Sequence, residues 1–325
     1  MPVRMKDIAR ELGISPMAVS KALRDHKDIG EETKQRVKKR AAELNYRMDW
    51  IARSMVTGRT FLVGLVVPDL MQSFFAEIAT ALTAALSPAG YHLVIAHSNE
   101  NAQDEAANIE LLVSRKVDGL IIASARREAR AFRNLETPYV LIDREVPGLD
   151  ANFVGTRNEE IGFLAANHLI EQGCRRIAHL KGPLLSTAEG RLEGYRRALK
   201  KQGLSPLIEE AGHDDAGGYQ AMRRLLRKKP DGVFCFNDPV AAGAMRAILE
   251  VRLSIPGDVA IIGAANMHYA DMFRIPLSTV DQDTRALGDE AARLLLAGMT
   301  DKGKLAPRDI VLPPRLIVRD SSRRR

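Results

Sequence analysis

The chain is poor in cysteine: only Cys174 and Cys235 occur among its 325 residues, and each stands in an apolar stretch. Two separate thiols provide neither a disulfide framework nor a CxxC metal pair, which indicates a reducing compartment. Long apolar runs are also missing, because 61–68 and 259–265 fall far short of the roughly 20 residues that span a bilayer. The charged segment 1–7 lacks the apolar core of a signal peptide. We therefore expect a cytoplasmic protein without a membrane helix.

Motifs of enzymes and metal sites are missing as well. The seven histidines show no HExxH or metal-cluster spacing, and we find no phosphate loop or nucleophile elbow. The segment 182–185, Gly-Pro-Leu-Leu, indicates a turn rather than a GxGxxG nucleotide-binding motif. The sequence therefore predicts no catalytic residue, no metal ligand and no cofactor.

Positive charge is concentrated near the N-terminus. The net charge is +7, and residues 1–60 carry 14 Lys and Arg against 8 Asp and Glu, whereas the rest of the chain carries 34 against 33. A basic unit of this size is typical of proteins that neutralise DNA phosphates. A solvated basic helix would give the same charge pattern, so the motif within this segment has to distinguish the two.

Three short helices are predicted in this basic segment. Apolar residues fall on one face of 6–12, and Gly13 ends that helix. Ser15-Pro16 supplies an N-cap and a proline at the first helical position, so a second helix, 16–24, begins within about three residues. A third helix, 31–44, packs beneath the first two. This spacing defines a helix-turn-helix headpiece.

Beyond residue 60 the sequence alternates between apolar runs and helical patterns. The first set of predicted buried strands is 61–68, 92–96, 119–123 and 139–143, and the second set is 176–180, 232–236 and 259–263. Such a rhythm is typical of an α/β fold with two lobes, each built on a doubly wound parallel sheet. Ligands bind at the carboxyl ends of such strands, so we expect a pocket between the lobes.

These motifs together resemble the lactose repressor (LacI/GalR) family of transcriptional regulators. The residues that carry the resemblance in the headpiece are 5–9, 13–15, 19–23, Thr33, Val37 and 44–46, and those beyond it are 52–55, 64–68, 117–119 and 316–319. They follow in the family's order over nearly the whole chain. The resemblance implies a headpiece at 1–47, a hinge helix and linker at 48–60, and a periplasmic-binding-protein-like effector core at 61–325. Its N-terminal lobe is expected at about 61–158 plus 285–312, and its C-terminal lobe at about 159–284 plus 313–325.

The resemblance implies that the second helix lies in the major groove, with Pro16, Met17 and Lys21 at base-contacting positions. Lys21 can donate to guanine O6 and N7, and Met17 can contact a thymine methyl group, whereas Pro16 has no donor. We interpret Ser15 and Ser20 as groups that cap the helix and position the backbone. A phosphate contact for Lys21 and headpiece packing for Met17 are the alternatives.

The resemblance also implies that the hinge helix enters the minor groove and inserts an apolar side chain at the operator centre. Met55 stands where the family has a leucine, and Arg53 lies beside it as a further DNA-binding residue. The family's Pro-Asn is replaced by Met48-Asp49, in which Asp49 can act as an N-cap. For Trp50 we favour a dimer or core contact over a DNA contact.

For the ligand pocket the resemblance implies a set of residues at strand ends. The predicted ligand-binding residues are Asp69, Ser73, Phe74, Phe75, Ser124, Asp143, Arg191, Asp214, Asn237, Asn266 and Gln282. A phenylalanine can stack on an apolar ligand face or pack between the lobes, and Arg191 with Asp143 can hold hydroxyls or a carboxylate. Arg191 is expected in a strand-end loop, as the dominant anchor.

Two departures from the family pattern affect the expected ligand. The family commonly has Gly-aromatic-Asp where this chain has Gly263-Ala264-Ala265, so a ligand-binding carboxylate is absent. The loop at 213–215 is a residue shorter than in some members. Asp214 in that loop is either a replacement acid or a solvated charge. The sequence therefore predicts a small polar effector, a sugar or related metabolite, without identifying it.

The resemblance and the symmetry of operators predict the partners. A helix-turn-helix contacts one half-site, so we expect a homodimer on a pseudo-palindromic double-stranded operator. Residues 319–325 contain no apolar heptads, which predicts no tetramer-forming coiled coil. A repressor is favoured over a ligand-dependent activator. A transport-type sugar-binding protein or an enzyme of the same two-lobed fold are rivals that would not need the basic helix-turn-helix.

Overall fold

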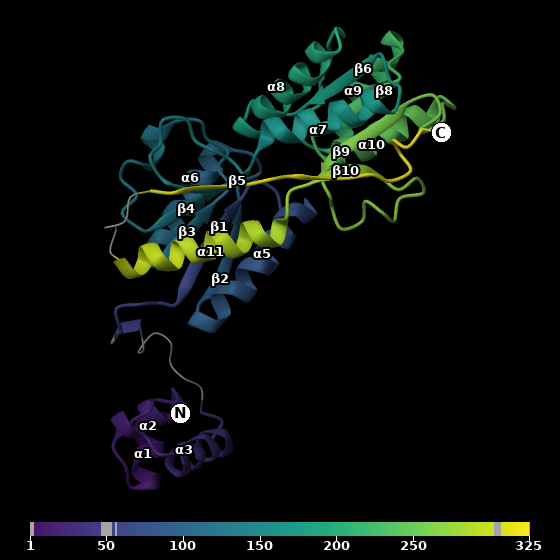
Figure 1. Ribbon diagram of the computed structural model, residues 1–325. Coiled ribbons are helices and arrows are strands. Elements are labelled where there is room, and N and C mark those ends of the chain that lie inside the picture. The colour runs from purple at the N-terminus through teal and green to yellow at the C-terminus, as the bar shows by residue number, and fades with distance from the viewer. Residues whose placement is uncertain (1–2, 47–53, 56, 302–306, 325) are drawn as a thin grey trace. The chain divides into compact units, whose positions relative to one another are not determined.

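The structure is a computed structural model that describes residues 3–46, 54, 55, 57–301 and 307–324. The chain divides after Thr60 into two compact units, a small helical headpiece and a larger α/β core (Figure 1). These units confirm the predicted fold class of N-terminal helices followed by two lobes with parallel sheets.

The headpiece consists of three helices: α1 (Met5–Leu12), α2 (Pro16–Leu23) and α3 (Glu31–Glu43). Gly13 ends α1 with a left-handed φ of 66°, a conformation that glycine adopts without steric cost. The Ser15 hydroxyl accepts the N–H of Ala18 at 3.1 Å and so caps α2, as predicted. Ile8 and Val19 are fully buried in the small core between the helices.

The first lobe of the core contains a six-stranded parallel sheet in the order β11-β5-β4-β3-β1-β2. Its strands are β1 (Leu62–Val67), β2 (His92–His97), β3 (Gly119–Ile122), β4 (Tyr139–Ile142), β5 (Asn152–Thr156) and β11 (Asp309–Leu312). Its helices are α5 (Ser73–Leu86), α6 (Ala102–Ser114) and α11 (Thr284–Asp301), with 3-10 turns at Ser87–Ala89 and Ala129–Phe132.

The second lobe repeats this architecture with the order β12-β10-β9-β8-β6-β7, in which only β12 runs antiparallel to its neighbour. Its strands are β6 (Ile177–Lys181), β7 (Leu207–Glu210), β8 (Gly232–Cys235), β9 (Ala260–Ala265), β10 (Ser278–Asp281) and β12 (Arg315–Ile317). Its helices are α7 (Asn158–Glu171), α8 (Ser186–Lys201), α9 (Asp215–Leu225) and α10 (Asp238–Glu250), with a 3-10 turn at Leu226–Lys228.

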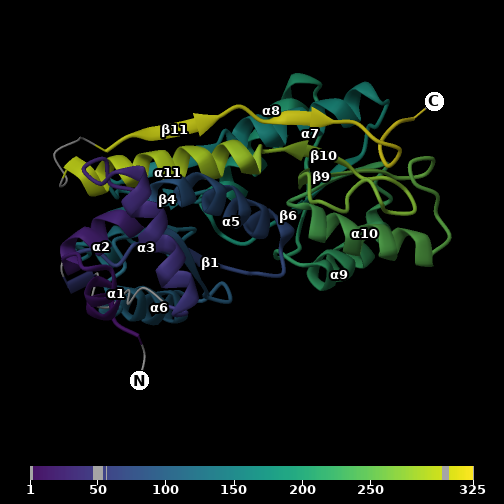
Figure 2. The ribbon, with the colours of Figure 1, turned by 90° about the horizontal axis from the view of Figure 1, so that it is seen from below.

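Each sheet is covered by helices on both faces. In the first lobe α5 and α11 lie side by side on one face, and α6 covers the other (Figures 1 and 2). In the second lobe α7 and α8 cover one face, while α9 and α10 cover the other (Figure 2). Burial on both faces explains why the central strands are continuous apolar runs.

The chain crosses between the two sheets at three places in the described core: from β5 to α7, from β10 to α11, and from β11 to β12. Figure 1 shows the last crossing as the long yellow segment that runs along both lobes. The carboxyl ends of the central parallel strands in both sheets therefore lie next to these crossings. This is the place where a pocket between the lobes was predicted.

The strands β5, β7, β10 and β11 are absent from the sequence prediction, whereas β12 overlaps 316–319, where the family resemblance implies the last strand. The edge strands β7 and β11 mix polar and apolar residues because one side of each faces solvent, and β5 and β10 contain several polar residues. Strand β2 was predicted from its apolar run as a buried strand, but it is an edge strand whose residues are partly or largely exposed. The other predicted strands are buried central strands with continuous apolar runs.

The pair α7 and α8 is packed backbone to backbone through two glycines. A Cβ placed on Gly162 of α7 would lie 1.9 Å from the Arg191 carbonyl oxygen, and one on Gly194 of α8 would lie 1.9 Å from the Glu159 carbonyl oxygen. No real Cβ atom tolerates such a distance, so any larger residue must separate the helices. This close approach fixes the position of α8.

The close approach of α7 and α8 predicts that Gly162→Ala destabilises the core by about 1–3 kcal/mol, because overpacking forces two backbones apart. The matched control is Gly298→Ala in α11, where nothing lies within 4 Å of the added Cβ. Alanine there should stabilise the helix by roughly 0.5–1 kcal/mol. Urea unfolding measures both variants, and equal effects would contradict the packing account.

Candidate effector pocket and DNA-binding surface

A pocket of about 110 Å³ lies between the carboxyl ends of strands from both sheets. The first lobe contributes residues that follow β1 and β4, and the second lobe contributes residues that follow β8, β9 and β10. The lining residues are Met71, Gln72, Ser73, Phe74, Phe75, Asp143, Arg144, Thr187, Arg191, His213, Phe236, Asn237, Pro239, Ala264, Ala265, Met267, Tyr269 and Gln282. The pocket thus joins apolar walls to a few charged and amide groups, which is the usual composition of a small-molecule site.

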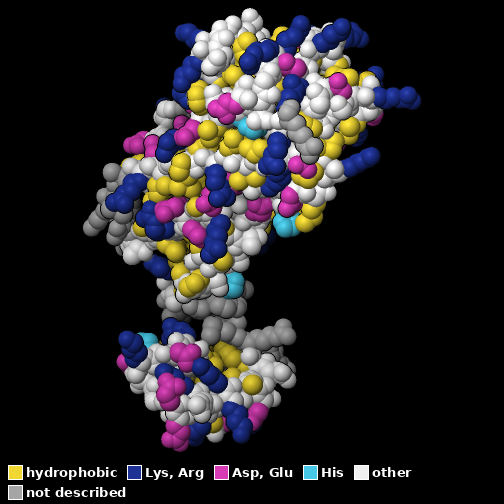
Figure 3. Space-filling view, turned by 45° about the vertical axis from the view of Figure 1, so that its right-hand side comes forward, with side chains coloured by type: hydrophobic (Ala, Val, Ile, Leu, Met, Phe, Trp, Pro, Cys, Tyr) yellow, Lys and Arg dark blue, Asp and Glu magenta, His cyan; other side chains and the backbone are white. Residues whose placement is uncertain are grey.

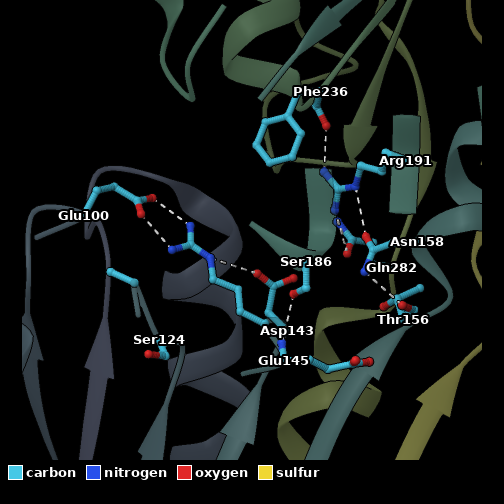
Figure 4. A network of polar contacts seen from close by, with 12 residues as sticks. Glu100, Ser124, Asp143, Glu145, Thr156, Asn158, Ser186, Arg191, Phe236 and Gln282 are labelled. Atoms are coloured by element: carbon cyan, nitrogen blue, oxygen red, sulfur yellow. Dashed lines mark hydrogen bonds and ion pairs between the residues drawn. The ribbon is translucent and has the colours of Figure 1, made fainter. Parts of the chain in front are cut away.

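Arg191 connects three separate segments of the core at this pocket. Its guanidinium donates to the Phe236 carbonyl oxygen at 2.6 Å, to Asn158 Oδ1 at 3.0 Å and to Gln282 Oε1 at 3.2 Å (Figure 4). Asn158 and Gln282 lie at two of the three crossings between the sheets, and the Phe236 ring lies 4.8 Å from the guanidinium. The arginine therefore forms hydrogen bonds to residues at two crossings and also lines the pocket.

The position of Arg191 corrects one detail of the sequence prediction. The residue lies within helix α8 and not in a strand-end loop. Its side chain is 3% exposed, and burial lowers the pKa of Arg191 to about 10, so it remains charged at neutral pH. The glycine-mediated contact with α7 holds this helix, and therefore the guanidinium, in place.

Asp143 and Arg144 form the charged part of the pocket that the first lobe contributes. Both η nitrogens of Arg144 donate to the carboxylate of Glu100 at 2.7 Å, and its Nε lies 3.7 Å from Asp143 Oδ2. Figure 4 shows Glu100 and Asp143 on opposite sides of the guanidinium between them. Burial raises the pKa of the Asp143 carboxyl, and the nearby Arg144 and Arg191 oppose that rise.

Seven of the eleven predicted ligand residues line the pocket. These are Ser73, Phe74, Phe75, Asp143, Arg191, Asn237 and Gln282. The two phenylalanines are buried against each other with ring centroids 5.2 Å apart, and the Phe75 ring lies 5.9 Å from the Arg144 guanidinium. Asn237 also caps α10 by accepting the Val240 N–H at 2.9 Å. Their roles in ligand binding stay predictions.

The other four predicted residues are absent from the lining and have local partners. Asp69 accepts the Met71 N–H at 2.8 Å, and Ser124 donates to the buried Glu105 carboxylate at 2.9 Å. Asp214 caps α9 by accepting the Gly217 N–H at 2.7 Å, which argues against its use as a replacement acid. Asn266 accepts from Arg319 at 2.8 Å.

Arg144 is the most important lining residue that sequence reasoning missed. Its signal was present, because it directly follows Asp143 in the chain. The apolar walls formed by Met71, Phe236 and Met267, and the polar groups of Gln72, Thr187 and His213, were also missed. Phe236 and Met267 follow the strands β8 and β9, but their side chains are apolar and so do not stand out from core residues.

The predicted base-contacting residues lie on one short helix of the headpiece. Met17 is 64% exposed at the start of α2, and Pro16 precedes it. The ammonium of Lys21 lies 2.9 Å from Asp28 Oδ2, and the Ser20 hydroxyl accepts from Arg24 at 2.9 Å. Lys21 is therefore paired within the headpiece, and its base contact stays a prediction.

Other basic groups of the headpiece are also paired. Lys38 lies 2.5 Å from Asp25, and Arg40 pairs with Glu11 and Glu43. Basic and acidic side chains are accordingly interspersed on the headpiece face in Figure 3. Met55, the predicted apolar wedge, is 82% exposed, whereas Arg53, Asp49 and Trp50 lie outside the described residues.

Both parts of the chain match known proteins. The family described as bacterial regulatory proteins, lacI family, matches residues 4–49, and the periplasmic binding protein-like domain matches residues 166–322. The ribose operon repressor of Halalkalibacterium halodurans is 31% identical over 322 residues, which cover 98% of this chain and 97% of that protein. The HTH-type transcriptional repressor PurR of Actinobacillus pleuropneumoniae is 30% identical over 329 residues, covering 98% of each chain.

Similarity also extends to a solved complex. The lac repressor dimer bound to operator and the anti-inducer ONPF has a TM-score of 0.84 at 25% identity, and the match covers 99% of both chains. This chain belongs to the lacI family of bacterial regulatory proteins. The prediction of a DNA-binding transcriptional repressor with a ligand-binding core is thereby confirmed. The relatives are regulators rather than enzymes, and no helix among the described residues is long and apolar enough to cross a membrane.

Asp238 is a buried residue of the second lobe that holds the pocket-lining residue Met267 in place. It is fully buried, and its carboxylate accepts the Thr279 hydroxyl at 2.7 Å and the N–H of the lining residue Met267 at 2.8 Å. A Cβ on Gly263 would lie 2.2 Å from Asp238 Oδ1, so only glycine fits there. Burial raises the pKa of Asp238 to about 6.

The raised pKa of Asp238 predicts a defined pH dependence of stability. Between about pH 4 and pH 6 the folded chain binds this proton more tightly than the unfolded chain, so the contribution of Asp238 to stability falls as pH rises. Relative to wild type, Asp238→Asn should therefore gain on the order of 2–3 kcal/mol in unfolding free energy from pH 4 to pH 7. Urea unfolding at several pH values gives the difference, and a pH-independent difference would contradict the account.

Proposed function

We propose that this chain represses transcription in the cytoplasm by binding a pseudo-palindromic operator as a homodimer, and that a neutral, compact, polyhydroxylated effector in the pocket changes its operator affinity. Three kinds of observation support this: the family membership, the exposed α2 surface and the chemistry of the pocket. The solved lac repressor relative is a dimer on its operator, which supports the same assembly here.

The charge balance of the pocket carries the proposal of a neutral effector. Its two buried arginines, Arg144 and Arg191, are matched by the carboxylates of Glu100 and Asp143. A charged ligand would add an uncompensated charge to this buried cluster, which is costly at low dielectric constant. A neutral ligand adds none.

Polar atoms at the pocket lack hydrogen-bond partners in the described structure, and a ligand with hydroxyl groups could supply them. The buried Ser73 Oγ and Arg144 Nε make no hydrogen bond within the described structure, and the Asp143 carboxylate lies 3.7 Å from Arg144 Nε, beyond hydrogen-bond distance. Hydroxyl groups can donate to the carboxylate and accept from the guanidinium. The small volume of about 110 Å³ favours a compact ligand such as a pentose over an extended one. A ribose operon repressor among the relatives supports the same class.

The proposed effector class is tested by thermal unfolding of the full chain with neutral aldopentoses and aldohexoses, with their aldonates, and with purine bases. We expect a neutral sugar to raise the unfolding temperature in a concentration-dependent way, because a ligand that binds only the folded state stabilises it. Stabilisation by aldonates or purines alone would overturn the neutral-sugar assignment.

The DNA-binding role of α2 predicts that Lys21→Ala costs about 1–3 kcal/mol on the selected operator while leaving affinity for random DNA nearly intact. The operator is first selected from a random duplex library, and competition binding then gives both affinities. Lys39→Ala, which alters an exposed lysine of α3, serves as the control. Equal weakening on operator and random DNA would reduce Lys21 to a phosphate contact.

A further inference from the structure

The ion pair between Glu100 and Arg144 occupies both ends of the guanidinium fork. The two η nitrogens donate to the two carboxylate oxygens at 2.7 Å, and the arginine side chain is only 5% exposed. Glu100 itself does not line the pocket. It faces the ligand space only through Arg144.

The backbone that presents Glu100 is held in an unusual conformation. Asn99 and Glu100 have φ values of 50° and 57°, in the left-handed region that a glutamate rarely adopts. The Glu100 N–H donates to the Pro68 carbonyl at 3.2 Å, and the Asn101 N–H donates to the Ser98 carbonyl at 2.8 Å. Strain of this kind persists only where the surroundings enforce it, and it concentrates at functional sites.

The pairing with Glu100 leaves one N–H group of the guanidinium, at Nε, without a hydrogen bond to the described residues, beside the pocket residue Asp143. Arg144 Nε is buried without a hydrogen-bond partner in the described structure, and it lies 3.7 Å from Asp143 Oδ2. A single hydroxyl can accept from this N–H and donate to that carboxylate. A ligand carboxylate would find no free fork of two N–H groups and would face two negative side chains.

We propose that Glu100 is a specificity-determining positioning residue, which makes Arg144 a hydroxyl-binding group and excludes acidic ligands from the pocket. This inference rests on the proposed neutral-sugar function. According to this inference, Glu100, a residue outside the pocket lining, determines whether the pocket prefers a sugar or the corresponding sugar acid. Without the Glu100 carboxylate, Arg144 has a free charged fork that suits a carboxylate.

The inference is tested with Glu100→Gln in the full chain. Isothermal titration of wild type and variant uses paired probes, each neutral aldose with its aldonate, such as D-ribose with D-ribonate. In wild type the neutral probe should bind at least roughly tenfold more tightly. In Glu100→Gln the affinity for the neutral probe should fall by roughly tenfold and the affinity for the aldonate should rise. The preference for the neutral probe is then lost or reversed.

Two further variants separate specificity from stability. Glu105→Gln removes a buried carboxylate of the same lobe that bonds Ser124 and Ala125 outside the pocket lining, so it should lower stability without changing the preference. Glu100→Asp keeps the negative charge and should keep the preference for the neutral probe. If Glu100→Gln fails to fold, Glu100→Gly removes the carboxylate while relaxing the left-handed backbone.

The outcomes are distinguishable. An unchanged preference in Glu100→Gln, or an equal change in Glu105→Gln, would overturn the inference while leaving the proposed function intact. If wild type binds no neutral sugar of the panel, the proposed function fails, and this inference fails with it.

Discussion

The core depends on one buried guanidinium. Arg191 joins the loop after β8 to two of the crossings between the lobes, through Phe236, Asn158 and Gln282. Charge-assisted hydrogen bonds of this kind are strong only where water is excluded and every donor is positioned. The glycine contacts between α7 and α8 provide that positioning. The chemistry of the pocket and the local structure at two of the crossings therefore depend on the same side chain.

Electrostatic balance then limits what the pocket can bind. A buried arginine is tolerated when carboxylates and carbonyl oxygens compensate for its lost hydration, and the pocket satisfies this condition without a ligand. Ligand binding is therefore not needed to neutralise the cluster. It can instead add contacts to both lobes at once, since the lining residues come from both. A ligand that favours one arrangement of the lobes can shift the equilibrium between arrangements by its difference in affinity for them.

The sequence predicted the fold well because its signals are local. Ser15-Pro16 starts a helix by its own chemistry, and the central strands are apolar because helices cover both faces. Site residues were harder to predict. Asp214 and Ser124 carry groups suited to a ligand, but nearby backbone or side-chain atoms satisfy them, and sequence cannot distinguish a helix cap from a ligand contact. Arg144 was missed although it directly follows Asp143, because its ion-pair partner Glu100 lies 44 positions away in the chain.

The coupling between pocket and operator is the central claim, and reciprocal titration tests it most directly. The full chain is titrated with its selected operator duplex in the absence and presence of saturating neutral sugar, and then with that sugar in the absence and presence of the duplex. Linkage requires that the two affinities change by the same factor. The account predicts one common factor clearly different from one. A sugar that binds the chain tightly while leaving operator affinity unchanged would contradict it.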